Sequence, residues 1–155
     1  MSSTASGFTL ESSGFAPGGR IPQRYSCEGD DVSPGLRWRD PPARLSAFAL
    51  IVDDPTARGF VHWVVADMPA DTTELPEGVG HSGGLGAAVE GRNDFGRIGW
   101  SGPCPPPGAD HRYVFTLLAL AQPLGLRAGA SADEVRAAAR SRTLGTAILE
   151  GVFGR

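Results

Sequence analysis

The sequence predicts a mainly β protein, an antiparallel β-sandwich. Apolar runs rich in strand-forming residues follow one another along the chain, and only one late stretch carries clear helix signals. The 22 Gly and 13 Pro residues are dispersed between these runs, which indicates many turns between short strands and not a disordered block. Strands in series with a single late helix favour a sandwich over alternating strand–helix units.

The strands follow from alternation and from their boundaries. A brief strand is predicted at residues 36–38, between "SPG" and "RDPP". Longer strands are predicted at residues 45–54, 60–69 and 111–121, each with a proline at or just after its end.

The remaining segments carry weaker signals, apart from one helix. Residues between Pro69 and Gly99 are rich in glycine and predict loops with short pairing segments. Ser131 followed by Glu134 fits a capping box and predicts a helix start. The tail from residue 143 is ambiguous, and its β-branched residues favour a final strand.

The length of 155 residues favours one domain, which we expect at residues 8–155 after a flexible N-terminus at residues 1–7. The net charge of −3 excludes a basic field for nucleic acid, and no apolar run is long enough for membrane insertion. No signal peptide is visible, so we expect a cytoplasmic protein. Cys27 and Cys104 are then expected as free thiols, although a folded chain that brought them together would allow them to pair.

Polar residues suited to ligand binding or catalysis lie at the ends of the predicted strands. Asp54 ends one strand, His62 opens the next, and His111 and Tyr113 open a third. Because alternate residues of a strand share a face, we expect His111 and Tyr113 on one side, with Phe115 and Leu117. The same rule places His62 on the side of Val64 and Ala66, opposite Trp63 and Val65. If the two strands are neighbours, both histidines converge beside the Asp54 turn.

Such a cluster predicts an anion site, since imidazoles, a phenol and backbone amides are donors that favour a negative charge. The residues alone leave alternatives open. Each histidine is equally compatible with a hydrogen-bonded structural role. Zinc is disfavoured because no close-spaced ligand pair such as HxH occurs. Cys104 beside a histidine would suit a nucleophile, but a cysteine between prolines favours packing.

Three stretches together resemble the phosphatidylethanolamine-binding protein family, in particular its bacterial and archaeal Raf-kinase-inhibitor-like branch. They are "GFTLESSGFAPGGRIPQRYSCEGDDVSPGLRW", "IVDDPTARGFVHWVVADMP" and "RNDFGRIGWSGPCPPPGADHRYVFTLLAL". The resemblance covers nearly the whole chain. The third stretch is similar to the long family signature G-x-x-x-Y-x-G-P-x-P-P-x-G-x-x-H-R-Y, which is too specific for a chance match.

The resemblance implies a sandwich of two antiparallel sheets with a few peripheral helices. It also implies a shallow pocket for phosphate, acetate or phosphoethanolamine-like groups, with no cofactor and no metal. The residues expected at the pocket are Asp54, Pro55, His62, Trp100, Gly102, Pro103, His111 and Tyr113. In this interpretation the Gly-Pro run forms one wall, and Arg112 faces away from His111 to pair with an acid.

Five residues depart from the family pattern, one of them Phe153, where Tyr is common. Thr56 replaces an acid and Arg58 a proline, so we expect a less negative rim at which Arg58 reaches an anionic ligand. Trp100 stands where Tyr is usual and adds a stacking wall, and Asp67 replaces the usual Asn.

The function expected is that of a small binding and regulatory protein, with an anionic or phosphorylated ligand and a protein kinase or protease as its partner. By the same resemblance a homodimer is plausible. One alternative is an enzyme that uses His62, His111 and Asp54 in acid–base chemistry on a metabolite. Another is a protease inhibitor that acts through an exposed loop.

Overall fold

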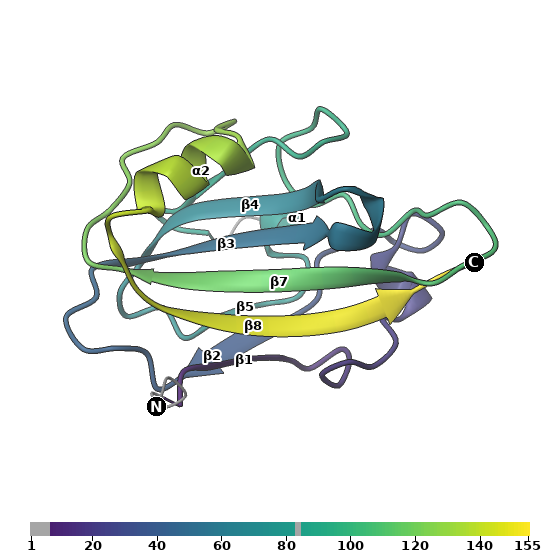
Figure 1. Cartoon of the computed structure of the whole chain (residues 1–155), viewed down its shortest axis with the longest axis horizontal. Coiled ribbons are helices and arrows are strands. Elements are labelled where there is room, and N and C mark those ends of the chain that lie inside the picture. The colour runs from purple at the N-terminus through teal and green to yellow at the C-terminus, as the bar shows by residue number, and fades with distance from the viewer. Residues whose placement is uncertain (1–6, 83–84) are drawn as a thin grey trace.

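The computed structural model describes residues 7–82 and 85–155, within which two antiparallel sheets pack face to face (Figure 1). The smaller sheet has the order β1-β2-β5, with the strands Thr9–Ser12, Leu36–Arg39 and Glu74–Leu75. The larger sheet has the order β6-β4-β3-β7-β8, with the strands Val89–Glu90, Phe60–Pro69, Ala47–Asp54, His111–Leu120 and Thr143–Phe153. The predicted mainly β sandwich is confirmed. Of the N-terminal stretch predicted to be flexible, residues 1–6 lie outside the described residues.

Helical segments are short and peripheral. Helix α2 (Ala132–Ala139) carries the predicted capping box, in which Ser131 Oγ accepts from the Glu134 amide and Glu134 Oε1 accepts from the Ser131 amide. The other helical segments are α1 (Val79–Ser82) and the 3₁₀ turns η2 (Gln23–Tyr25) and η3 (Pro55–Ala57). No described helix has the length and hydropathy that a membrane span requires.

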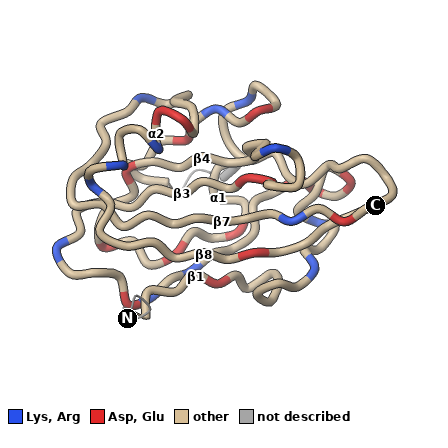
Figure 2. Tube along the Cα trace, viewed as in Figure 1, with Lys and Arg blue, Asp and Glu red and all other residues tan. Residues whose placement is uncertain are grey.

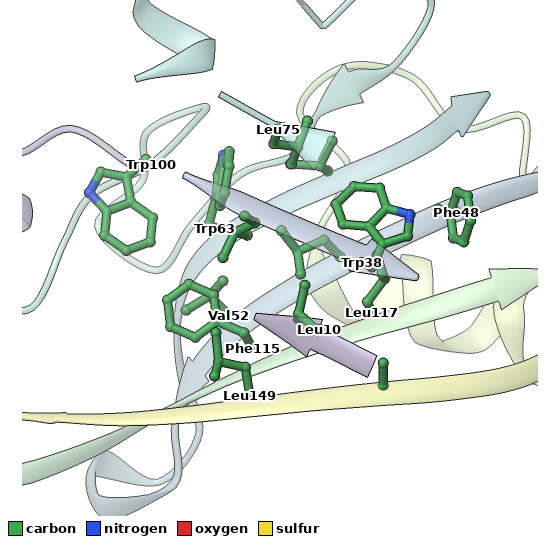
Figure 3. Packing of buried hydrophobic residues seen from close by; sticks show 14 of the residues in the cluster. Leu10, Trp38, Phe48, Val52, Trp63, Leu75, Trp100, Phe115, Leu117 and Leu149 are labelled. Atoms are coloured by element: carbon green, nitrogen blue, oxygen red, sulfur yellow. The ribbon is translucent and has the colours of Figure 1, made fainter. Parts of the chain in front are cut away.

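Strand β3 is buried on both faces, which explains its continuous apolar run. Phe48, Leu50 and Val52 face the main core between the two sheets. Figure 3 shows Phe48 beside Trp38, and Val52 beside Phe115. The alternate residues Ala47, Ala49 and Ile51 face a second cluster beneath α2. The larger sheet is therefore the middle layer of the molecule, and α2 covers part of its outer face (Figure 1).

A β-bulge in β4 changes the expected side of His62. Val52 lies opposite Trp63 and Asp53 lies opposite Val61, so His62 is the extra residue between these pairs. Val61 consequently packs under α2 with Val64 and Ala66, while the ring of His62 contacts the main-core residue Tyr113. The expectation that His62 shares a face with Val64 and Ala66 is wrong, because one inserted residue reverses the alternation.

Strand β4, which carries His62, and strand β7, which carries His111, are not neighbours in the sheet. Strand β3 lies between β4 and β7 and pairs with both. The two histidines still converge, because each lies near the C-terminal end of β3 on one of its two neighbouring strands. The final strand favoured by the tail is confirmed, since these residues form β8. The guanidinium of Arg112 lies 3.6 Å from the carboxylate of Glu150 on β8, as expected for a side chain that faces away from His111 and pairs with an acid.

Cys27 and Cys104 form a disulfide, so the expectation of free thiols is wrong. The two residues are 77 positions apart, and the fold brings their Cα atoms to 5.4 Å. The bond also removes Cys104 as a nucleophile. Disulfides are uncommon in reducing compartments, and the cytoplasmic location stays a prediction.

Candidate functional site

An open pocket of about 160 Å³ lies where β3 ends and β7 begins. Its polar lining comes from Asp54, His62, His111 and Tyr113. The rest of its lining is mainly apolar and comes from Ala57, Phe60, Phe95, Cys104, Pro105 and Pro106. The convergence expected for the two histidines, the tyrosine and Asp54 is thus present in the fold.

Asp54 is a buried carboxylate whose two oxygen atoms bind different partners. Its Oδ1 accepts from the amides of Thr56 at 2.7 Å and Ala57 at 3.1 Å, so that it caps η3. Its Oδ2 lies 2.6 Å from Nδ1 of His111. Thr56 Oγ1 accepts from the Arg112 amide, which ties η3 to the start of β7. One side chain therefore orders both the turn and the histidine.

His111 is the first residue of β7, and its side chain is 18% exposed. Because a carboxylate oxygen only accepts, the Nδ1–H of His111 donates to Asp54. This arrangement fixes the ring and leaves Nε2 for a ligand in the pocket.

His62 is buried, and this burial determines the charge state of its ring. Its Nδ1 lies 2.7 Å from the carbonyl oxygen of Ser101, which requires a hydrogen on Nδ1. Burial lowers the pKa of His62, and the carbonyl of Ser101 and the charge of Asp54 oppose this effect only in part. The ring is therefore neutral near pH 7, and its Nε2 is an acceptor.

Tyr113 lies between the two histidines. Its ring centroid is 5.2 Å from that of His62 and 6.5 Å from that of His111. Burial, and secondarily the charge of Asp54, raise the pKa of Tyr113. The phenol stays protonated and is available as a neutral donor.

The Gly-Pro run contributes to the pocket differently from the expectation. Cys104, Pro105 and Pro106 line it, whereas Gly102, Pro103 and Pro55 are not among the lining residues. The amide of Gly102, a residue expected at the pocket, donates to Asp31 Oδ1 at 2.7 Å. Gly102 also lies so close to the Tyr25 carbonyl that a Cβ would be 2.0 Å from its oxygen. The Gly102 end of the Gly-Pro run is therefore packed against other segments of the protein and does not face a ligand.

Trp100 does not line the pocket, which corrects the expected stacking wall. Figure 3 shows its ring beside Trp63 and Phe115 in the main core, and it is 8% exposed. Its Nε1–H donates to the Tyr25 carbonyl at 3.2 Å. A large indole with one donor is more stable buried with that donor satisfied than at an open rim.

Arg58 also lies outside this pocket. It adopts a left-handed conformation with a φ of 59° after η3 and lines a separate cavity, together with Asp53 and Arg136. Asp53 and Asp54 point to opposite faces of the sheet end, because they are successive residues of β3. The turn that follows directs Arg58 to the Asp53 side, so its expected reach to a ligand in this pocket is not supported.

The sequence analysis missed the aromatic part of the lining. The rings of Phe60 and Phe95 are 4.8 Å apart and both lie within 6 Å of His62, at 5.2 and 5.7 Å. Buried Asn93 forms the loop that presents Phe95: its Oδ1 accepts from the amides of Phe95 and Arg97. Its Nδ2 donates to Gly99 and Ser101. The polar, glycine-flanked "RNDFGRIG" was the available signal for such a loop.

The site can hold one ligand between oriented polar groups and apolar walls. His111 supplies an oriented Nε2, Tyr113 a neutral donor, and His62 an acceptor. Among the described residues there is no group of three or more His, Cys, Asp or Glu that could hold a metal ion.

Comparisons with known proteins agree with this fold. The phosphatidylethanolamine-binding protein family model matches residues 11–154. The chain is 44% identical to a UPF0098 protein of Methanothermobacter thermautotrophicus, over 94% of this chain and 98% of that protein. It is 37% identical to the UPF0098 protein YbhB of Escherichia coli, over 93% of this chain and 98% of that protein.

One further relative and two solved structures extend the picture. A Mycobacterium tuberculosis relative, 38% identical over 94% of this chain and 71% of that protein, is named as a lipoprotein, LppC. Escherichia coli YbcL, described as a new member of the mammalian PEBP family, superposes with a TM-score of 0.89 at 31% identity, covering 96% of this chain and 99% of YbcL. The homologue CT736 of Chlamydia trachomatis gives a TM-score of 0.87 at 33% identity, covering 97% and 99%.

Proposed function

Because the chain belongs to the phosphatidylethanolamine-binding protein family, we propose that it is a binding protein whose pocket takes a small anionic group, such as phosphate, a phosphoethanolamine-like group or a carboxylate. The observation that carries the proposal is the 2.6 Å bond between Asp54 and His111. It orients the imidazole so that Nε2 is left for a ligand at a pocket with largely apolar walls.

The binding energy depends on the hydrogen bond between Nε2 of His111 and the anion. A protonated imidazole forms a charge-assisted hydrogen bond with an anion, which is stronger than a neutral one. Phe60, Phe95 and Pro105 reduce the water around that bond and so strengthen it. The carboxylate of Asp54 binds Nδ1 and thereby holds the ring in the orientation in which Nε2 is left for the anion.

Charges of both signs are mixed along the part of the chain that the structure describes. Figure 2 shows acidic and basic residues interspersed along the chain, consistent with its net charge of −3. Arg112 beside the pocket is paired with Glu150, and Arg136 with Asp53. Local geometry, and not a broad positive field, therefore has to provide affinity.

Calorimetry and thermal shift with inorganic phosphate, phosphoethanolamine and acetate test the proposal. We expect saturable binding by the protein and a loss of at least about tenfold in affinity in His111→Ala, because a hydrogen bond to a charged group is removed. Arg112→Ala is the matched control, since the neighbouring side chain faces away and should leave affinity unchanged. No saturable binding by the folded protein would overturn the proposal.

Acid–base catalysis is a second candidate, favoured by one specific observation. A carboxylate-held histidine and a neutral histidine face one pocket, an arrangement that suits a general acid and a general base. Turnover of the tightest-binding ligand, lost in both His62→Gln and His111→Ala, would support it. Regulation of a kinase or protease, action through an exposed loop, and a homodimer stay predictions from the family resemblance.

A further inference from the structure

We propose that the disulfide between Cys27 and Cys104 is a redox switch of the pocket. In the oxidised protein it holds the wall, defined as residues 103–107, against the body of the molecule. Its reduction by a dithiol releases the wall and weakens ligand binding. The inference rests on the proposed binding function, because it concerns regulation of the same pocket.

The wall has few backbone donors for hydrogen bonds to the rest of the fold. Four of its five residues are prolines, which lack a backbone N–H, so Cys104 alone can donate from the main chain. It has no strand or helix of its own. The wall therefore depends on donors and bonds supplied by other segments.

Those attachments converge on one turn, residues 26–29. The Cys27 amide donates to the Pro103 carbonyl at 3.0 Å, and the Cys27 sulfur is bonded to Cys104. The Pro105 carbonyl accepts from Arg155 Nε at 2.7 Å, and the same guanidinium lies 3.1 Å from Glu28 of the turn. Besides the burial of Pro103 and Pro105, the disulfide is thus the covalent member of a set of attachments whose other members are single hydrogen bonds and an ion pair.

Release of the wall would change the pocket directly. Cys104, Pro105 and Pro106 line it, together with Asp54 and His111. Consecutive prolines are stiff, so the wall moves as a unit and does not collapse locally. Gly108, with a φ of 128°, follows the wall at a backbone position suited to a hinge. An open wall admits water to the His111 bond, which weakens it.

The disulfide is accessible to a reductant. Cys27 is exposed and Cys104 is partly buried. A thiolate of the incoming dithiol attacks the Cys27 sulfur, and the Cys104 sulfur leaves and takes up a proton. The second thiolate of the reductant then attacks the mixed disulfide and releases Cys27. Two electrons and two protons pass to the protein, and the reductant ends as a disulfide.

Calorimetry with inorganic phosphate, on the oxidised protein and after treatment with dithiothreitol, tests the switch. Mass spectrometry establishes the thiol content of each sample. We expect affinity to fall roughly fivefold or more on reduction, because the wall then has to be ordered by the ligand. Cys27→Ser/Cys104→Ser should bind as weakly as the reduced protein and should not respond to the reductant. Arg112→Ala, with the disulfide intact, should respond like the unsubstituted protein.

Hydrogen exchange of the same samples separates release of the wall from general unfolding. Faster exchange confined to the amides of Cys27, Cys104 and Gly108, with β3 and β7 still protected, supports the switch. Equal affinity in both redox states, or loss of protection throughout β3 and β7, overturns it. If the oxidised protein binds no phosphate, the proposed function fails, and the local exchange change alone then decides whether reduction releases the wall.

Discussion

Asp54 and His111 are 57 residues apart in the sequence, and their side chains meet at 2.6 Å at the pocket. The same carboxylate caps η3 through its other oxygen. The turn after β3 and the first residue of β7 are therefore held by one buried charge. Any ligand that binds Nε2 of His111 is bound to a ring whose orientation this charge determines.

We predict that Asp54→Asn weakens phosphate binding by about tenfold or more, because a neutral amide holds the His111 ring less firmly than the carboxylate does. Asn still accepts from the Thr56 amide, so the fold should persist with a small loss of stability. Calorimetry at pH 7 measures the affinity. Asp53→Asn is the matched control, since this neighbouring acid pairs with Arg136 on the opposite face. Equal effects of the two substitutions would argue against a role for the Asp54–His111 pair.

His62 gives the protein a pH dependence of known sign. Its pKa lies below the ordinary value of 6.5, so the ring is neutral in the folded state while the unfolded state takes up a proton below that value. Stability is thus lost as pH falls from about 6.5 to the lowered pKa, by at most about 1.4 kcal/mol per pH unit. Chemical denaturation at pH 7.5 and 5.5 should show a smaller loss in His62→Gln. Identical losses in both proteins would contradict this origin.

Trp100→Phe should lower the free energy of unfolding by about 1–2 kcal/mol, because the donor to the Tyr25 carbonyl and part of the core packing are lost. Affinity for phosphate should not change, since Trp100 lies in the core and not in the pocket lining. Urea denaturation and calorimetry measure the two effects separately. A large loss of affinity with little loss of stability would restore the stacking role expected from the sequence.

Asn93→Ala should affect both stability and binding. The substitution removes four hydrogen bonds from a buried loop, at a cost of about 2–4 kcal/mol. It also loosens Phe95 and the Ser101 carbonyl that binds His62. Asn93→Asp keeps the acceptor for Phe95 and Arg97 but loses the donors to Gly99 and Ser101. If both variants bind phosphate as well as the unsubstituted protein, the loop has no part in shaping the pocket.

Much of the fold follows from local patterns. The long apolar runs predicted β3, β4 and β7 because burial of a central strand requires continuous apolar residues. Ser131 and Glu134 predicted the start of α2 because a capping box needs only four consecutive residues. The short strand β1 was missed, since "TLES" has a partly polar pattern and is a strand only because β2 pairs with it.

The pocket was predictable where strand alternation is regular and not where it is interrupted. Strand β7 is regular there, so His111 and Tyr113 share the expected side. Strand β4 contains a bulge at His62, and a bulge depends on how two strands fit and leaves no periodic signal. Phe95 reaches the pocket from a loop whose shape depends on the long-range packing of Asn93.

By itself, the sequence determined the strand-rich architecture, the capped helix and the set of polar residues at strand ends, because each depends on neighbours a few positions away. Only the tertiary structure decided that Cys27 bonds to Cys104, that Trp100 is buried and that Arg58 faces another cavity. These outcomes depend on distances between segments far apart in the chain. Such distances result from packing two sheets and a helix together, and no local pattern encodes them.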